Sequence, residues 1–337
     1  MTLQSIPVWL DCDPGNDDAF AILLSIFDSR FNLLGISTVH GNAPLDKTTK
    51  NALGLLDLLH IYNIPVYNGS ELPLAKLPRF ATHVHGINGI GGVELPNYTI
   101  NQHSNNESYL EGIKQAIDDN ENEICLCFTG ALTNLSKLIT TYPKVKDKIK
   151  YISIMGGAFG IGNITPFSEF NFHADPKAAK HIIQELQDKI ILSPLNLTHE
   201  VTASAQVVKE MERNGHDSII WKAFYEILNF YYRHQTKKLD GPPLHDPVAL
   251  YSLLPFISHD FKSYGYKYLR RRIDVVETGE KEGQSYIIDI DIPIDKQEEQ
   301  GVYIGSELDG DLFWASVLGA LKAAEMHVNK LELENNK

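Results

Sequence analysis

Cysteine and positive charge are both scarce in this sequence, and each shortage excludes classes of protein. Among 337 residues there are three cysteines, Cys12, Cys125 and Cys127. An odd count with a bare C-x-C spacing is typical of neither a disulfide framework nor a zinc site, so we expect buried free thiols in a reducing compartment. The 43 Asp and Glu residues outnumber the 30 Lys and Arg residues, and the formal charge of -13 argues against nucleic acid as a partner.

Long apolar segments are missing as well. No stretch approaches the ~18 apolar residues that predict a membrane span, so we expect no membrane partner. Residues 1–7 lack the basic and apolar regions of a secretory signal. Together with the free thiols, this predicts a cytoplasmic location.

What the sequence does contain is a regular alternation of apolar runs and stretches with helical spacing. The apolar runs predict strands at residues 6–10, 33–39, 64–67, 124–128, 149–155 and 190–195. The stretches between them predict helices at residues 18–27, 48–60, 108–117, 132–142 and 176–186. This order predicts an α/β fold with an open, mainly parallel (mixed) sheet flanked by helices, which is Rossmann-like.

Three segments depart from this alternation. Residues 69–106 are rich in Pro, Gly, His and Asn, and so long a loop predicts part of an active site. Residues 272–276 and 285–292 alternate apolar and polar side chains, which predicts a C-terminal antiparallel hairpin added to the sheet or packed beside it. We expect a closing helix at 312–324, a frayed tail at 330–337, and a single domain over residues 1–337 because no linker divides the chain.

The strongest local signal follows the first predicted strand. Four carboxylates, Asp11, Asp13, Asp17 and Asp18, fall within eight residues, with Pro14-Gly15 between them. A lone Asp here would be explained as a helix cap. Four repel one another unless a cation or bound donor offsets the repulsion, and they lie where parallel sheets bind ligands. The pattern favours a site for a polyol or a hard cation, calcium or magnesium rather than zinc.

Polar groups also follow the other predicted strands, and several have an ordinary structural explanation. Asn42 could be a turn residue that ends a strand. Asp246 before Pro247 could cap the apolar helix that follows, and His245 could be a buried structural histidine. Because these positions share one edge of the predicted sheet, we expect them to surround a common site.

Taken together, the motifs resemble those of the nucleoside hydrolase family, the inosine-uridine preferring nucleoside hydrolases. The marker is Asp-x-Asp-Pro-Gly-x-Asp-Asp at residues 11–18. The other landmarks follow in order: Gly41-Asn42, His83-Val84-His85-Gly86, residues 129–134, Met155-Gly156-Gly157, Ala174-Asp175-Pro176 and His245-Asp246-Pro247. Residues 6–11 and 241–246 look closest to the fungal uridine nucleosidase branch.

The resemblance implies a calcium-dependent enzyme that cuts the N-glycosidic bond of ribonucleosides. The family's metal ligands match Asp13, Asp18, Asp246 and the backbone carbonyl of Thr129. Asp13 also matches the general base, Asp11 an acid behind the ligands that orients the turn, and His245 a residue that helps the base to leave.

The resemblance also implies which side chains hold the substrate. Asp17 and Asn42 match contacts to the ribose 2′-hydroxyl, Asn171 to the 3′-hydroxyl, and Asn163 with Glu169 to the 5′-hydroxyl. Met155 would lie against the sugar, and His85 would contact the substrate from the long loop. The base pocket is not assigned by residue: Tyr231, Tyr232, His234 and Gln235 could line it or belong to the core.

The implied mechanism is direct attack by water. The cation would fix a water and the sugar diol, Asp13 would accept the water's proton, and nearby carboxylates would stabilise the oxocarbenium-like transition state. Since no protein nucleophile is needed, we expect inversion at the anomeric carbon. The resemblance further implies a homodimer or homotetramer and a role in pyrimidine salvage. Uridine preference rests on the branch resemblance, with non-specific purine and pyrimidine ribonucleoside hydrolysis as the alternative.

Two hypotheses of other classes are weaker. A phosphatase of the haloacid dehalogenase type also has Asp-x-Asp after its first strand, but it needs Thr or Val shortly afterwards, where this chain has Pro14-Gly15. A non-catalytic, calcium-dependent ribose-binding protein is disfavoured because Asp13 and every matched sugar contact are present.

Overall fold

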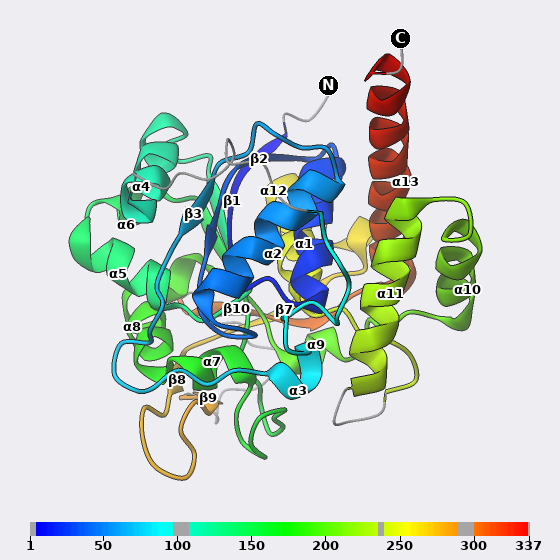
Figure 1. Ribbon diagram of the computed structural model, residues 1–337. Helices are drawn as coiled ribbons and strands as arrows, with labels where there is room; N and C mark the ends of the chain where they lie inside the picture. The colour runs from blue at the N-terminus through cyan, green and yellow to red at the C-terminus, as the bar shows by residue number, and fades with distance from the viewer. Residues whose placement is uncertain (1–4, 97–107, 235–238, 289–299, 336–337) are drawn as a thin grey trace.

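The computed structural model describes residues 5–96, 108–234, 239–288 and 300–335. Its centre is an eight-stranded sheet (Figure 1). In sheet order the strands are β3(Val66–Asn68), β2(Phe31–Thr38), β1(Ile6–Cys12), β4(Cys125–Phe128), β5(Tyr151–Met155), β6(Ile190–Ser193), β10(Val302–Glu307) and β7(Lys267–Arg271). All neighbouring pairs among these strands are parallel except β10 and β7.

Helices cover both faces of the sheet and bury a core on each. One face carries α1(Asn16–Phe27), α2(Leu45–Leu58), α11(Ile219–His234), α12(Asp246–Ser258) and α13(Gly310–Asn335). The other carries α4(Tyr109–Asp119), α5(Thr133–Thr141), α6(Val145–Lys148) and α8(Pro176–Leu186). Strand β1 contributes side chains to both cores, because successive side chains of a strand point to opposite faces of the sheet. Val8 and Leu10 belong to the first core and Trp9 to the second.

Short elements gather at one edge of the sheet. These are α3(Thr82–His85), α7(Phe170–Ala174) and α9(Leu195–Thr198), with a separate two-stranded sheet of β8(Ile273–Val275) and β9(Ser285–Ile287) near them (Figure 1). The remaining helix, α10(Ala205–Asn214), packs on α11.

The strand order creates a switch point between β1 and β4. The chain runs from β1 outward to β2 and β3, then returns to β4 on the other side of β1. The two connections leave in opposite directions, so a crevice opens beyond the carboxyl ends of these two strands, where doubly wound sheets bind ligands. Asp11 pairs with Phe128 in the ladder, and the amide of Thr129 donates to the Asp11 carbonyl at 2.9 Å, which fixes both strand ends at the crevice.

The α/β fold predicted from the sequence is confirmed, with differences at the C-terminal end. The antiparallel hairpin forms as the separate β8–β9 sheet beside the main sheet, and residues 289–292 of the predicted hairpin lie outside the described residues. Strands β7 and β10 were not predicted. Helix α13 continues to Asn335, into the segment from residue 330 that we expect to be frayed.

The cysteines and the apolar helices bear on two expectations drawn from composition. All three cysteines are free and buried, as predicted. Among the described residues, no helix combines the length and the apolar character that a membrane crossing requires.

Candidate active site

The turn between β1 and α1 is built around the Asp18 carboxylate. Asp18 is the third residue of α1, and its Oδ2 accepts a hydrogen bond from the backbone N–H of Gly15 at 2.9 Å, which caps the helix. The same oxygen accepts from Asn42 Nδ2 at 3.1 Å, and Oδ1 accepts from the hydroxyl of Thr129 at 2.8 Å. One carboxylate therefore joins the ends of β1, β2 and β4.

Asp13 is held between two glycines. A Cβ at Gly41 would come within 2.0 Å of Asp13 Oδ2, and one at Gly130 within 2.7 Å of Oδ1, so only glycine permits this close approach. Oδ2 accepts a hydrogen bond from the backbone N–H of Asn42 at 2.7 Å, whereas Oδ1 is buried without a hydrogen-bond partner. A buried carboxylate oxygen with no donor is costly, which indicates that a ligand is to meet it.

Two further carboxylates, from Asp17 and Asp246, meet Asp18 at this turn. Asp17, Asp18 and Asp246 each offer an oxygen, and these oxygens lie within 4.8 Å of one another. Asp246 is the first residue of α12 and Asp17 is in the first turn of α1, so two helix N-termini point at the cluster. Burial, and then the charges of its neighbours, raise the pKa of Asp17 to about 7 and that of Asp246 well above its ordinary range.

The donor set fits a hard divalent cation. The groups of the cluster are all buried carboxylates, which are ligands that such cations prefer. The pKa of Asp13 is also raised well above its usual value, mainly by burial and next by the negative charge of Asp18. The compact cluster contains Asp17, which the resemblance implied as a ribose contact, in addition to the implied ligands Asp18 and Asp246. Asp13 lies outside this compact group but has the free oxygen.

Behind the cluster, Asp11 supports the strand ends. Its Oδ2 accepts from Ser37 Oγ and from Asn134 Nδ2, the latter at 2.7 Å. Burial raises the pKa of Asp11 to about 7. Asp11 is buried and does not line the pocket.

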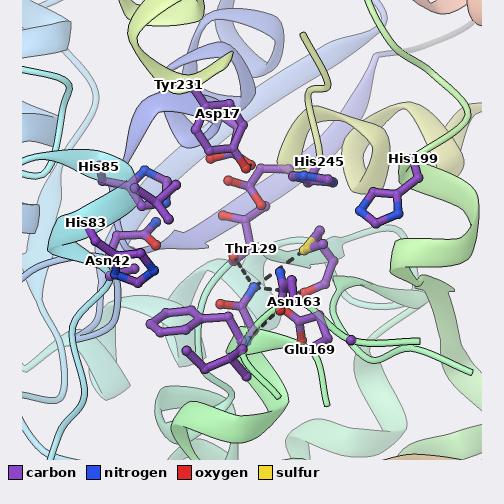
Figure 2. Close-up of a pocket in the computed structure, with 18 of the residues that line it drawn as sticks. Asp17, Asn42, His83, His85, Thr129, Asn163, Glu169, His199, Tyr231 and His245 are labelled. Carbon is purple, nitrogen blue, oxygen red and sulfur yellow. Dashed lines mark hydrogen bonds between the residues drawn. The ribbon is translucent and has the colours of Figure 1, made fainter. Parts of the chain in front are cut away.

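Amide and carboxylate side chains form the wall opposite Asp17 (Figure 2). Asn171 Nδ2 donates to the carbonyls of Thr129 at 2.7 Å and Met155 at 3.2 Å. Its two hydrogens are thereby used, so its oxygen is the group left for a substrate hydroxyl. Glu169 caps α7: Oε1 accepts from the Asn171 amide, and Oε2 accepts from the amides of Gly157 and Phe172. Burial raises the pKa of Glu169 to about 7.

Histidines and one tyrosine form the side walls. His245 Nδ1 lies 2.7 Å from the hydroxyl of Thr198, and the ring stands edge-on to His199. On the other side, His85 stacks on Tyr231 and its Nδ1 accepts from the Asn16 amide at 3.2 Å. Burial lowers the pKa values of His85 and His245 to about 3, so both rings are neutral at pH 7.

The structure brings most of the predicted residues together. One pocket is lined by Asp17, Asn42, His85, Thr129, Met155, Asn163, Glu169, Asn171, His245 and Asp246. Asp13 and Asp18 are buried beside it without lining it.

The candidates for the base pocket differ in whether they line the pocket. Tyr231 lines the pocket and donates to Asp17 Oδ2 at 3.2 Å. Tyr232 and His234 are exposed and do not line it, and Gln235 lies outside the described residues. The spacing of α11 could have distinguished them, because Phe224, Ile227 and Tyr231 share one buried helical stripe that excludes Tyr232.

Sequence reasoning missed other lining residues, notably His199, Ile164 and Leu239. His199 follows the predicted strand at residues 190–195, but nothing in its spacing indicates contact with His245. Ile164 and Leu239 lie in irregular segments without periodicity.

Amides and carboxylates can bind the hydroxyls of a polyol, and buried carboxylates can activate water. At the switch point of this sheet the two kinds of group lie together, which is typical of a hydrolase that acts on sugar-containing substrates. Comparison with known proteins narrows that class. The chain belongs to the family described as "Inosine-uridine preferring nucleoside hydrolase", whose sequence model matches residues 8–315. It is therefore a ribonucleoside hydrolase by family, as the resemblance of its motifs implied.

The named relatives agree with this assignment. A uridine nucleosidase of Saccharomyces cerevisiae is 40% identical over 96% of this chain and 98% of its own length. A pyrimidine-specific ribonucleoside hydrolase, RihA, of Escherichia coli is 33% identical over 74% of this chain and 80% of its own. Among solved structures, a purine-preferring ribonucleoside hydrolase from Gardnerella vaginalis has the same fold, with a TM-score of 0.83, 24% identity, and coverage of 95% of this chain and 99% of that one.

The raised carboxylate pKa values predict how stability depends on pH without metal. In the unfolded chain these groups ionise near a pKa of about 4, so above that pH the folded state holds the extra protons. This stability is fully present below about pH 4 and is lost as pH rises through the folded pKa, about 7 for Asp11 and Asp17. The buried histidines act in the opposite direction only below their unfolded pKa of about 6.5.

We therefore predict that, in EDTA, the melting temperature falls between about pH 6.5 and about pH 8. Calcium should raise it more at the higher pH, where fewer protons compete for the carboxylates. Scanning fluorimetry measures both effects. A metal-free melting temperature that rises across this range, or a calcium effect independent of pH, would contradict the cluster described here.

Proposed function

We propose that this enzyme hydrolyses the N-glycosidic bond of ribonucleosides, with uridine as the preferred substrate, and releases the free base and ribose. The observation that carries the proposal is the buried cluster of Asp17, Asp18 and Asp246 beside the unpartnered oxygen of Asp13, within reach of amides suited to sugar hydroxyls. Support for uridine comes from the relatives named uridine nucleosidase and pyrimidine-specific ribonucleoside hydrolase.

We assign the cation site to Asp13, Asp18, Asp246 and the Thr129 carbonyl. Donors that are all oxygen suit calcium or magnesium, and we take calcium as the ion because the family resemblance implies it. When bound, calcium would hold the ribose diol and lower the pKa of the attacking water. Asp13 then accepts the water's proton through Oδ1, the oxygen that no protein donor occupies. Because no side chain attacks the sugar, the anomeric carbon is inverted.

The sugar is held from both sides. Asp17 and Asn42 meet the 2′-hydroxyl, and Asn171 uses its free amide oxygen for the 3′-hydroxyl. Asn163 and Glu169 meet the 5′-hydroxyl, with Met155 against the ring. All of these side chains line the one pocket, which supports their common role. The carboxylates also stabilise positive charge on the ribose as the bond breaks.

His245 assists the departing base as a hydrogen-bond donor. Burial keeps its ring neutral, so one nitrogen carries a hydrogen while the other accepts. When Thr198 donates to Nδ1, the hydrogen is on Nε2, which is then free to donate to the base. This hydrogen bond would stabilise the negative charge that develops on the base as the N-glycosidic bond breaks.

The compartment, the assembly and the pathway complete the proposal. Three buried free thiols fit a reducing compartment, which supports a cytoplasmic enzyme. The family resemblance leads us to propose a homodimer or homotetramer, and the uridine preference a role in pyrimidine salvage.

The substrate range tests the proposed reaction. Uridine, cytidine, inosine, adenosine and thymidine are incubated with enzyme and calcium, and the free base is measured by chromatography. We expect uridine to be turned over fastest and thymidine weakly or not at all, because it lacks the 2′-hydroxyl that Asp17 and Asn42 hold. Release of no base from any ribonucleoside, or tight uridine binding without turnover, would refute the proposal.

A variant of Asp13 tests its role as the general base. Asp13→Asn should lower kcat by about 10²- to 10⁴-fold, the usual contribution of a general base. Its fold should persist, and its melting temperature in EDTA should be no lower than that of the parent, because the metal-free fold no longer has to keep an acid protonated at this buried position. Asp46→Asn, at an exposed position on α2, is the matched control. Near-normal turnover by Asp13→Asn would remove Asp13 from the role of base.

A further inference from the structure

The β8–β9 hairpin lies beside the pocket, although its described side chains do not line it. It packs against α8 and lies close to α7 (Figure 1). The loop at its tip, residues 276–284, joins β8 to β9 and contacts two other segments that build different walls of the pocket.

The first contact is with the segment before α3. Lys76 forms an ion pair with Glu282 in the hairpin loop, and each side chain is only about a quarter exposed. Three residues after Lys76, Arg79 Nη1 donates to His173 Nε2 at 3.1 Å. This segment leads directly into Ala81, His83 and His85, which line the pocket.

His173 completes this contact. Arg79 can only donate, so His173 Nε2 accepts, and its Nδ1 must carry the hydrogen that is donated to the Glu282 carbonyl at 3.0 Å. His173 therefore bridges the segment before α3 and the hairpin loop. It belongs to α7, the helix that also carries Asn171.

The second contact is with the segment between β5 and α7. Ser285 Oγ accepts from the amide of Ala158 at 3.0 Å and donates to the carbonyl of the same residue at 2.8 Å. Lys281 lies over the ring of Phe167 at 5.3 Å. The stretch between these two anchors contributes Gly162, Asn163 and Ile164 to the pocket.

A close backbone approach fixes the hairpin against α7. Gly283 has φ of +82°, and a Cβ there would lie 2.6 Å from the Cα of His173. The backbones of the loop and the helix are thus in direct contact, which leaves the hairpin little freedom to shift relative to the pocket.

We propose that the hairpin loop, residues 276–284 with Ser285, is a clamp that fixes the distance between the two pocket walls. Glu282, Lys76 and Ser285 are positioning residues: they act on the substrate through His85 on one wall and Asn163 on the other. The effect on substrate rests on the ribonucleoside hydrolase activity proposed above, whereas the clamping of the wall before α3 does not.

The test reverses the charge at the ion pair. Glu282→Lys places a cation against Lys76 and Arg79 and should raise KM for uridine about five- to tenfold, with kcat changed less than about twofold because the β1–α1 acids are untouched. Glu280→Lys, at an exposed position in the same loop, is the matched control and should leave KM unchanged. The swap of Lys76→Glu with Glu282→Lys should restore KM.

Hydrogen exchange supplies a readout that needs no turnover. The amides of His85 and Gly91 are hydrogen-bonded within the long loop, and they should exchange faster in Glu282→Lys than in Glu280→Lys, and normally in the swap. If Glu282→Lys does not fold, Lys76→Met takes its place in both measurements. Equal KM and equal exchange in the test and control variants would overturn the clamp, as would a lowered melting temperature with unchanged KM. Absence of turnover in the parent enzyme would instead refute the proposed function, while the exchange data would still decide on the clamp.

Discussion

The rest of this structure depends on the burial of several carboxylates in one place. Removing each from water is costly, and their mutual repulsion adds to that cost. Hydrogen bonds offset these costs unequally for different carboxylates. Asp18 receives hydrogen bonds from Gly15, Asn42 and Thr129. Asp13 receives one, from the backbone N–H of Asn42, and its Oδ1 has no hydrogen-bond partner. The N-termini of α1 and α12 add favourable partial charge. A divalent cation bound in the cluster would add positive charge that offsets the remaining repulsion.

The sheet order explains why these groups can meet. Residues from the ends of β1, β2, β4 and β5 converge because parallel strands share a carboxyl edge and because the order reverses between β1 and β4. Glycines 41 and 130 allow the Asp13 carboxylate to sit directly against two neighbouring backbones. The hydrogen bonds from Asn171 to the carbonyls of Thr129 and Met155 then connect the cation side of the pocket with its sugar side.

Much of the site could be predicted because it follows from local pattern. Four acids after a strand and a His-Asp-Pro before a helix are contiguous signals, and the pocket gathers residues from both. The parts that could not be predicted depend on distant pairing. Strands β7 and β10 join a sheet begun more than 250 residues earlier, and Lys76 meets Glu282 across 206 positions. His199 belongs to the pocket only because α9 ends against His245, which no spacing within either segment reveals.

The central claim is that the buried acids hold a divalent ion that in turn holds the sugar. A crystal structure with calcium and ribose, with the ion located by its anomalous scattering, tests this most directly. The account predicts one ion bound by Asp13, Asp18, Asp246 and the Thr129 carbonyl, in contact with the sugar's 2′- and 3′-hydroxyls. Ribose bound away from the acids, or an acid cluster without an ion at saturating calcium, would contradict it.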